Sequence, residues 1–348
     1  MKKVLIVSDT LEHYRIPMFE SLCDRINLTI AHSSESLGSS NRFLHHPIAL
    51  KSKGPFITYE NLPNFNEFDI VILPFNIRCS ELFLTLFRKR NYKLFVFGIG
   101  VSASYNKLYD QDKKLDRLKM YILKKVDGAI FYDQYPFIKW FSLGINPTKL
   151  SIAYNTVSAD NKFSMEDKTL QNFLFIGSLY KQKKIFDLLN AYKIIVEKFS
   201  RDVPNLEIIG GGDEFENIKK WIISEKLDNK IILHGQINNA DILRPIFNRS
   251  IACISPGQAG LSVQKCFSYG IPFITSYNAI TGGESSSIIE QETGFLYDGT
   301  IKGLVEILTK IITKEVDMKE MSNKSHQYYE NFRNLEIWKN GFLKNIEF

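Results

Sequence analysis

The segment CISPGQAGLSVQKCFSYGIP, residues 253–272, predicts a buried strand, a turn with two glycines and a helix, in that order. Residues 255–260 have mostly small side chains that can pack little, and their glycines let a ligand approach the backbone. From Leu261 the apolar residues recur at mostly helical spacing until Gly270 and a following proline end the helix. A helix start presents unpaired N–H groups and a positive dipole end, which favour an anion, most often a phosphate. An ordinary connection between a strand and a helix fits this stretch equally well.

The length of the chain, 348 residues, exceeds the size at which single hydrophobic cores stop growing, so two domains are expected. The four cysteines are scattered and lack the paired spacing of metal ligands, which indicates a reducing cytosol without disulfides. The first apolar run ends at Ser8 and Asp9 and is typical of a strand rather than a signal peptide. No run of about 20 apolar residues occurs, so we expect a cytoplasmic chain without a transmembrane helix.

The charge of the chain is modestly positive, with 44 lysines and arginines against 38 acidic residues and a formal net charge of +6. This excess fits a phosphate-bearing ligand or weak attraction to anionic lipid better than binding to duplex nucleic acid, for which clustered arginines would be expected. Basic residues gather at 88–90, 113–114, 117–119, 124–125 and 181–184. The first four of these runs are taken as solvated surface by default.

Strand and helix patterns alternate along the chain, which predicts parallel sheets covered by helices. In the first half we expect strands near residues 4–7, 27–31, 69–73, 94–97, 128–132 and 150–153, whereas residues 43–59 show no regular pattern. In the second half we expect strands near residues 173–176, 206–209, 230–233, 251–254, 273–276 and 294–297. The sequence therefore predicts an α/β fold of two doubly wound halves with a cleft between them, joined by the polar stretch 154–167.

Two more loops after strands of the second half contain glycine. Gly177 ends the strand at 173–176, and Lys181, Lys183 and Lys184 follow it. Residues 210–212 are three consecutive glycines after the strand at 206–209. Ligands of doubly wound sheets bind outside the carboxyl ends of the strands, where a lysine could neutralise a diphosphate leaving group. The alternative is a solvated basic turn.

Several blocks of the second half together resemble the donor-binding domain of glycosyltransferase family 4. The blocks are Phe175-Ile176-Gly177-Ser178-Leu179 with Lys183, residues 206–212, His234-Gly235, Ser255-Pro256, Gly260-Leu261, Gly270-Ile271-Pro272 and Thr293-Gly294-Phe295-Leu296. Their order and spacing agree over about residues 150–300. Residues 1–150 resemble the family more loosely, through residues 4–7 followed by His13-Tyr14-Arg15-Ile16-Pro17.

The resemblance implies the GT-B fold, in which two Rossmann-like, doubly wound domains face each other across a cleft. It places an acceptor-binding domain at residues 1–154, a domain that binds the nucleotide sugar at 155–325, and a helix that returns to the first domain at 326–348. It also implies transfer of a sugar from a nucleotide-sugar donor, with retention at the anomeric carbon and without a metal ion or cofactor.

The resemblance also assigns the residues of the site. The catalytic residues would be Lys183 and Glu284, and the acceptor would contact His13, Tyr14 and Arg15. The donor would contact Gly177, Ser178, Lys183, Lys184, Gly211, Gly257, Gly260, Leu261 and Lys265.

The chain departs from the family pattern at three positions. The family commonly has two glutamates eight positions apart, and Gly257 and Lys265 stand there. Ser178 stands where arginine is frequent. The second glutamate normally holds the ribose hydroxyls, and Lys265 cannot accept those hydrogen bonds, although it could contact phosphate. Glu284 could supply a carboxylate near the donor sugar, or it could be a solvated loop acid.

The sequence thus predicts a hexosyl-type glycosyltransferase that extends a surface polysaccharide or a lipid-linked oligosaccharide. Its partners would be the nucleotide sugar and the saccharide acceptor, with no nucleic acid. If the acceptor is lipid-linked, the basic residues of 113–125 could contact the inner face of an anionic membrane. Two alternatives stay open, a noncatalytic scaffold of the same fold and a nucleotide-sugar epimerase.

Overall fold

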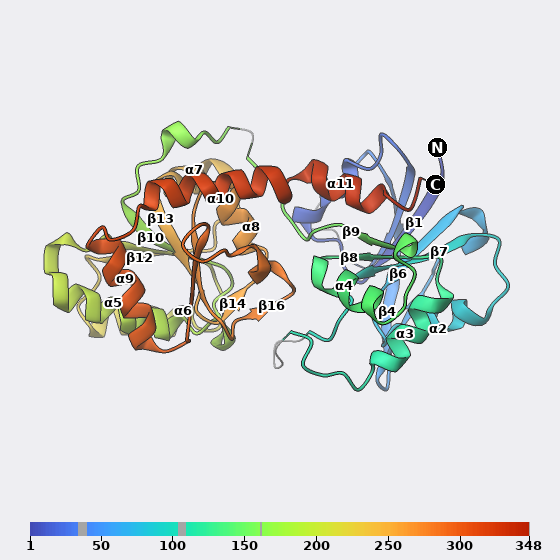
Figure 1. Cartoon of the computed structure of the whole chain (residues 1–348), viewed down its shortest axis with the longest axis horizontal. Helices are drawn as coiled ribbons and strands as arrows, with labels where there is room; N and C mark the ends of the chain where they lie inside the picture. Colours follow the sequence, from blue (N-terminus) through green and yellow to red (C-terminus); the bar gives the residue numbers. More distant parts are fainter. Residues whose placement is uncertain (34–39, 104–108, 161, 348) are drawn as a thin grey trace. The chain divides into compact units, whose positions relative to one another are not determined.

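The computed structural model describes residues 1–33, 40–103, 109–160 and 162–347 of the chain. The chain forms two compact units (Figure 1). One unit takes in the described residues of Met1–Ala103, Asp110–Ser158 and Leu335–Phe348. The other takes in those of Ser104–Tyr109 and Ala159–Asn334. The chain therefore leaves the first unit and comes back to it for its last residues.

The first unit contains a sheet of seven strands in the order β3-β2-β1-β6-β7-β8-β9. The strands are β1 (Lys3–Ser8), β2 (Asn27–His32), β3 (Leu44–Pro47), β6 (Ile70–Pro74), β7 (Lys93–Gly98), β8 (Gly128–Phe131) and β9 (Leu150–Ile152). All neighbouring strands are parallel. The strand order reverses between β1 and β6, which is the arrangement of a doubly wound sheet.

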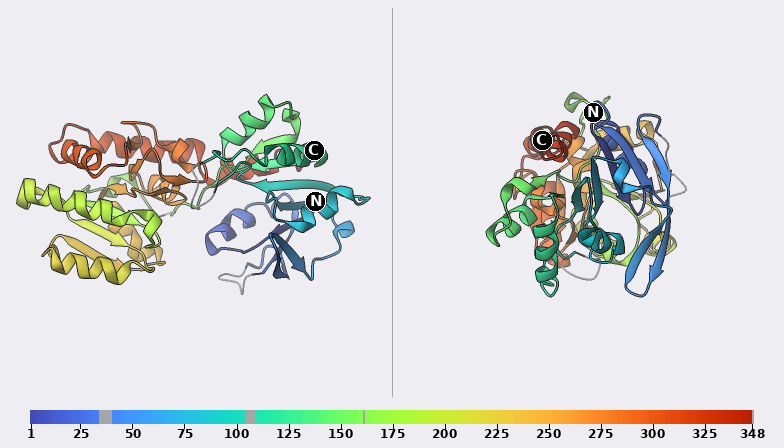
Figure 2. Two further views of the ribbon diagram at one scale, coloured as in Figure 1. Left: turned by 90° about the horizontal axis from the view of Figure 1, so that it is seen from below. Right: turned by 90° about the vertical axis from the view of Figure 1, so that its right-hand side faces the viewer.

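Apolar residues on both faces of this sheet explain its two helical layers. Along β1, Val4 and Ile6 join one core while Leu5 and Val7 join the other. The first core is covered by α1 (Ile16–Glu20) and α11 (Leu335–Leu343), and the second by α2 (Ser80–Phe87), α3 (Asp116–Lys125) and α4 (Gln134–Ser142). Figure 2 shows helices on both sides of the sheet in each unit.

Residues 43–59, for which no regular structure was expected, form β3 and an antiparallel hairpin of β4 (Ala49–Lys53) and β5 (Phe56–Glu60). The prediction of an irregular segment was wrong because β3 is the edge strand of the main sheet and β4 and β5 form a separate two-stranded sheet. Most of their residues are exposed or half-buried on both faces, so the alternation of apolar and polar residues that marks a strand is missing.

The second unit contains a parallel sheet of six strands in the order β12-β11-β10-β13-β15-β17. The strands are β10 (Asn172–Ile176), β11 (Leu206–Ile209), β12 (Ile231–Gly235), β13 (Ser250–Ile254), β15 (Phe273–Ser276) and β17 (Gly294–Tyr297). The strand order reverses between β10 and β13, so this sheet is also doubly wound. The predicted α/β fold with two Rossmann-like, doubly wound halves is confirmed.

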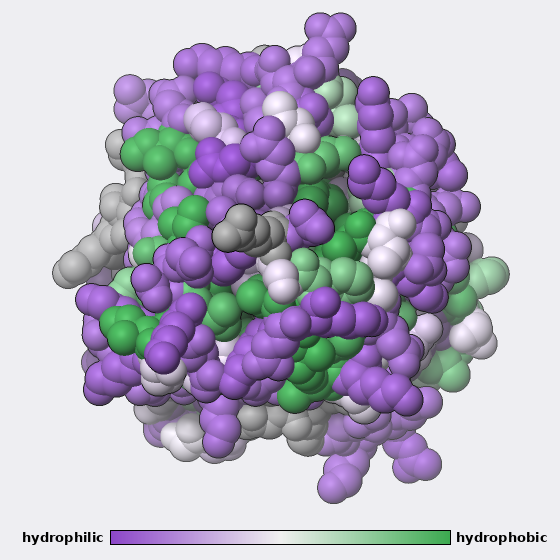
Figure 3. Space-filling view, turned by 90° about the vertical axis from the view of Figure 1, so that its left-hand side faces the viewer, coloured by the Kyte–Doolittle hydropathy of each residue, from purple (hydrophilic) through white to green (hydrophobic). Residues whose placement is uncertain are grey.

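Helices also cover both faces of the second sheet. One face packs against α5 (Ile185–Phe199), α6 (Phe215–Ser224) and α9 (Ile301–Ile312), and the other against α7 (Ala240–Asn248), α8 (Ser262–Ser268) and α10 (Met318–Phe332). A small parallel pair, β14 (Gln258–Ala259) and β16 (Ile280–Thr281), lies beside the main sheet. In the space-filling view of Figure 3, hydrophobic residues form patches interrupted by hydrophilic side chains.

The short 3-10 helices are η1 (His13–Arg15), η2 (Phe65–Glu67), η3 (Pro147–Lys149), η4 (Met165–Asp167), η5 (Lys181–Lys183), η6 (Ser200–Asp202) and η7 (Glu284–Ser287). Among the described residues, none of the helices has the length and apolar character needed to cross a membrane.

Candidate functional site

Three loops meet at the carboxyl edge of the second sheet, beside the point where its strand order reverses. They follow β10, β11 and β13 and cover residues 177–184, 210–214 and 255–261. Backbone hydrogen bonds join them: Leu179 N donates to Gly211 O at 2.8 Å, and Gly257 N donates to Lys183 O at 3.1 Å. The structure therefore brings together the glycine-containing loops that the sequence predicts as a ligand site.

Two glycines make the close approach of these loops possible. A Cβ on Gly257 would lie 2.0 Å from Gln182 O, and a Cβ on Gly210 would lie 1.9 Å from Gly177 O. Neither position has room for a side chain. Gly211 and Gly260 differ, since a Cβ there would meet nothing closer than 3.6 Å and 3.9 Å, respectively. The space around these two predicted donor contacts does not require glycine.

Lys183 is the buried cation of the site, with 7% of its surface exposed. Its Nζ points to Gly177, where a Cβ would lie 3.2 Å away, and it lies 5.7 Å from the centre of the Tyr180 ring. Burial lowers the pKa of this ammonium to about 8, while the nearby Cys253 thiol acts in the opposite direction. Its Nζ makes no hydrogen bond or ion pair with any other described residue, so its charge is not compensated within that part of the chain.

The other predicted residues of this loop are more open. Ser178 and Lys184 are both exposed. Lys184 has a left-handed backbone, with φ of 52°, and precedes α5. Both side chains can reach a ligand in solvent, but neither is fixed by a hydrogen bond of its side chain to another described residue.

The loop after β13 contains a contact that the sequence did not reveal. Tyr180 OH donates a hydrogen bond to the side-chain carbonyl of Gln258, and Ser255 Oγ donates to Gln258 O at 2.8 Å. Gly260 and Leu261 follow directly, at the start of the seven-residue α8. Tyr180 and Gln258 thus fix the loop in front of that helix. The only signal for them in the sequence is their position between the predicted strands and helices.

Lys265 does not point at this loop. Its Nζ lies 5.0 Å from the centre of the Tyr269 ring, one turn further along the chain. Tyr269 OH in turn donates to Asp160 at 3.1 Å, and Arg244 pairs with the same carboxylate at 2.6 Å. Burial lowers the pKa of Lys265, with Asp160 opposing the effect. These contacts account for the lysine without a phosphate.

Glu284 is buried and lies in η7, directly after β16. Its carboxylate accepts a hydrogen bond from Gly282 N at 2.8 Å. The pairing of β14 with β16, and a hydrogen bond from Ile280 N to Gly257 O at 2.9 Å, connect this turn to the loop after β13. The alternative of a solvated loop acid is therefore excluded.

A cavity of about 330 Å³ lies at the carboxyl edge of the sheet in the first unit. It is lined by Ile6, Val7, Ser8, Asp9, Thr10, Glu12, Tyr14, Arg15, Phe19, Ile72, Pro74, Phe97 and Tyr132. These residues belong to or follow β1, β6, β7 and β8, so the cavity lies where the strand order reverses, the usual ligand position of such sheets. Of the three predicted acceptor contacts, Tyr14 and Arg15 line this cavity, whereas His13 is exposed and packs edge-on against Tyr14.

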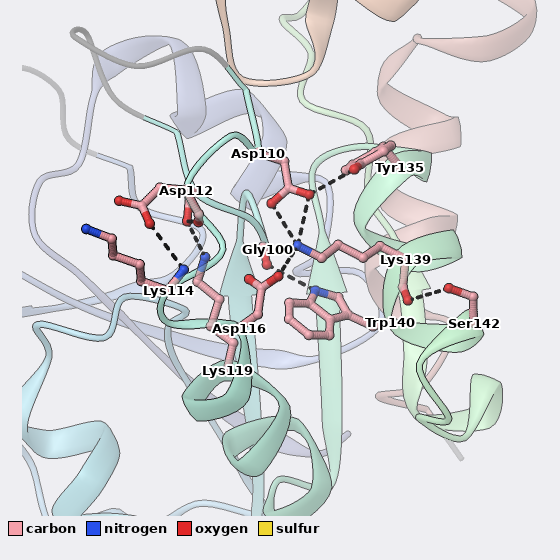
Figure 4. Close-up of polar contacts among 11 residues, drawn as sticks. Gly100, Asp110, Asp112, Lys114, Asp116, Lys119, Tyr135, Lys139, Trp140 and Ser142 are labelled. Atoms are coloured by element: carbon pink, nitrogen blue, oxygen red, sulfur yellow. Dashed lines mark hydrogen bonds and ion pairs between the residues drawn. The ribbon is translucent and has the colours of Figure 1, made fainter.

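A second polar cluster of the first unit has a structural role (Figure 4). Lys139 Nζ, on α4, lies 2.7 Å from carboxylate oxygens of both Asp110 and Asp116. Tyr135 OH donates to Asp110 at 2.8 Å, and Trp140 Nε1 donates to Gly100 O at 3.0 Å. The cluster anchors Asp110 and the start of α3 to α4.

No three histidine, cysteine or carboxylate side chains come together as a metal-binding group within the described ranges.

Comparison with known proteins gives relatives in sequence and in structure. An uncharacterized glycosyltransferase of Haemophilus influenzae is 27% identical over 192 residues, or 53% of this chain and 52% of that protein. The chain thus spans about half the length of this curated relative.

Two solved structures resemble the chain over almost its whole length. A glycosyltransferase from Rickettsia africae has a TM-score of 0.70 at 15% identity, with 99% of this chain and 97% of that one covered. Anabaena HepE in complex with UDP also has a TM-score of 0.70, at 12% identity and 99% coverage of both. At such identities the likeness shows the fold, which is GT-B.

The family model with the description "Glycosyl transferases group 1" matches residues 158–333. This range is just over half of the chain and contains all three loops of the second unit. The chain therefore belongs to the group 1 glycosyl transferases.

Proposed function

We propose that the chain transfers a hexosyl-type sugar from a nucleotide-sugar donor to a growing surface polysaccharide or a lipid-linked oligosaccharide. Family membership supports sugar transfer, and the UDP bound to HepE, a protein of the same fold, supports a nucleoside diphosphate as the leaving group. The resemblance to glycosyltransferase family 4 supports retention at the anomeric carbon, with no cofactor and no nucleic-acid partner.

The uncompensated charge of Lys183 is the observation that carries this proposal. A donor diphosphate would gain negative charge as its bond to the sugar breaks, and a fixed cation in a buried position stabilises such charge strongly. Lys183, with the backbone N–H groups at Gly260 and Leu261, would provide this stabilisation without a metal ion. Gly177 and Gly257 would let the diphosphate approach the loops, and Ser178, Lys184 and Gly211 would contact its outer parts.

Glu284 and the cavity of the first unit take the remaining roles. The buried turn of Glu284 is joined to the loop after β13, so its carboxylate is proposed to contact the donor sugar. The acceptor is proposed to bind in the cavity lined by Tyr14 and Arg15, with His13 at its rim. For Lys265 the contacts with Tyr269 and Asp160 favour a structural role over the predicted phosphate contact.

A peripheral contact with the inner face of an anionic membrane is part of the proposal. The helices α2, α3 and α4 cover one face of the first sheet, and their outer sides expose Leu84, Phe87, Tyr121, Ile138 and Phe141. Arg88 and Lys89 directly follow α2, and Lys124 and Lys125 are the last two residues of α3. Exposed aromatic residues beside lysines and arginines suit the interface of a bilayer that carries negative charge.

The donor site is tested by thermal unfolding of the full chain with and without UDP, GDP, CMP and dTDP and their sugars. We expect one nucleotide to raise the melting temperature, because a ligand that binds only the folded state stabilises it. Lys183→Ala should abolish the shift, since it removes the buried cation. Lys181→Ala, an exposed lysine of the same loop, is the matched control and should keep it.

Thermal unfolding together with turnover assays on the same nucleotide sugars separates the alternatives. If no nucleotide raises the melting temperature of the wild type or of Lys181→Ala, the donor site is contradicted. Binding without turnover towards any saccharide acceptor would favour a noncatalytic scaffold, and interconversion of the sugar nucleotide without an acceptor would favour an epimerase. Release of the nucleoside diphosphate only when an acceptor is present would support the transferase.

A further inference from the structure

The cavity of the first unit contains one positively charged side chain, Arg15, which forms no ion pair with the other described residues that line the cavity. Arg15 is the only lysine or arginine among the described residues that line it. Its guanidinium donates to Tyr132 OH at 3.3 Å and lies over two aromatic rings, 5.8 Å from the centre of Tyr14 and 5.4 Å from that of Tyr132. Tyrosine rings hold a cation in place but carry no formal negative charge.

Two other arginines of the chain, Arg244 and Arg249, have carboxylate partners. Arg244 pairs with Asp160 at 2.6 Å, and Arg249 is held by both carboxylate oxygens of Glu207. Arg15 has no carboxylate within ion-pair distance in the described part of the chain. An arginine that is half-buried, oriented by two tyrosines and unpaired is suited to bind an anion from outside.

Two carboxylates also line the cavity, and neither is directed at Arg15. Asp9 accepts a hydrogen bond from Tyr59 OH, and the side chain of Glu12 has no hydrogen bond to another described residue. Carboxylates are acceptors only, so the groups that they can bind are donors such as sugar hydroxyls. The cavity therefore combines one anion-binding group with acceptors for hydroxyl groups.

We propose that this cavity binds a saccharide that carries an acidic group, either a phosphate or a carboxylate. The acid is held by the guanidinium of Arg15, and hydroxyl groups of the sugar donate to Asp9 and Glu12. The volume of about 330 Å³ is within the range of small-molecule sites and suits one sugar ring with its acidic substituent. Calling this saccharide the acceptor rests on the proposed function, whereas its binding does not.

The test measures direct binding to the full chain by saturation-transfer NMR. The probes are glucose 1-phosphate, glucuronate and neutral glucose. We expect at least one acidic probe to bind about tenfold more tightly than glucose, since hydrogen bonds to charged groups are worth more than neutral ones. Arg15→Gln should remove this preference, Arg15→Lys should keep part of it, and Arg117→Gln, on the exposed surface of α3, should leave it unchanged.

Lys183 is a second possible anchor for a phosphate, so Lys183→Ala is included. Equal binding of acidic and neutral probes, no binding of any probe, or a preference that survives in Arg15→Gln but is lost in Lys183→Ala would each overturn the proposal. A preference for glucuronate alone or glucose 1-phosphate alone identifies the acid. If acidic probes bind through Arg15 while no nucleotide stabilises the chain, the cavity is a site for acidic saccharides and the proposed transferase function is wrong.

Discussion

Lys183 is charged at neutral pH although it is buried, and this makes its affinity for an anion depend on pH. Its pKa in the folded protein is about 8, below the ordinary 10.5 of a lysine. Above pH 8 the free protein loses the proton, and an anion must then supply the energy to restore it. We expect the affinity for the nucleoside diphosphate to weaken between pH 7 and pH 9, as measured by calorimetry, and Lys183→Met to show weak binding with no such trend.

The lowered pKa of Lys183 also affects the stability of the folded protein, in the direction opposite to its effect on affinity. Because the folded pKa is the lower one, the unfolded chain binds more protons between about pH 8 and 10.5, and the contribution of Lys183 to stability rises with pH over that range. Affinity and this contribution to stability therefore move in opposite directions, which distinguishes titration of Lys183 from general unfolding at high pH.

Gly257 and Gly260 form a matched pair for a test of the loop after β13. Gly257→Ala would place Cβ 2.0 Å from Gln182 O, so the two loops must move apart, at a cost of about 1–3 kcal/mol. Gly260→Ala meets nothing closer than 3.9 Å. We expect the first variant to lose both stability and nucleotide affinity in thermal unfolding, and the second to lose neither. An equal loss of stability and nucleotide affinity in both variants would show that the spacing of the two loops does not determine these properties.

At the scale of elements, the buried ion cluster fixes Asp110 and the start of α3 against α4. Lys139→Met would leave the carboxylates of Asp110 and Asp116 without their shared cation, and breaking a buried pair from one side costs about 3–5 kcal/mol. Urea unfolding should show this loss. Lys124→Met, at an exposed position of α3, should change stability by less than about 0.5 kcal/mol. A similar loss in both variants would contradict the structural role of the cluster.

Elements buried on both faces were predictable from the sequence, and elements at the edges were not. The apolar runs of β1, β10 and β13 mark strands directly, because both faces of these strands pack against helices. The two-residue strands β14 and β16 are too short to leave a pattern.

The site shows the same division. Gly177 and Lys183 were recognisable as candidates because they follow a clear strand and match a family pattern, whereas Gly257 was recognisable only by its place after a strand, since it departs from that pattern. The bond between Tyr180 and Gln258 joins residues that are far apart in the sequence, and the position of Tyr132 beside Arg15 depends on the pairing of strands. Such contacts arise only once the sheet has formed, so no local pattern signals them.

At the scale of the whole molecule, the membrane contact proposed for the surface of α2, α3 and α4 can be tested with lipid vesicles. We expect sedimentation with vesicles that contain anionic lipid, weaker sedimentation as salt rises, and little with neutral vesicles. Replacing Lys124 and Lys125 with glutamate should reduce it strongly. Replacing Lys302 and Lys310, on α9 of the other unit, with glutamate is the control and should leave the sedimentation unchanged. Equal sedimentation of the two double variants would contradict membrane binding by this surface.

The packing of α11 has a consequence for biosynthesis. Trp338 and Phe342 complete the core against the first strands of the chain, and Gly341 lies so close to Ile152 O that a Cβ would be 1.9 Å from it. The ribosome makes β1 before α11, with the second unit between them, so the amino-terminal sheet waits for α11 until residues 159–334 have been made. The consecutive residues 159–334 can finish folding sooner, and nascent chains stalled before residue 335 should leave the earlier-made unit open to proteases.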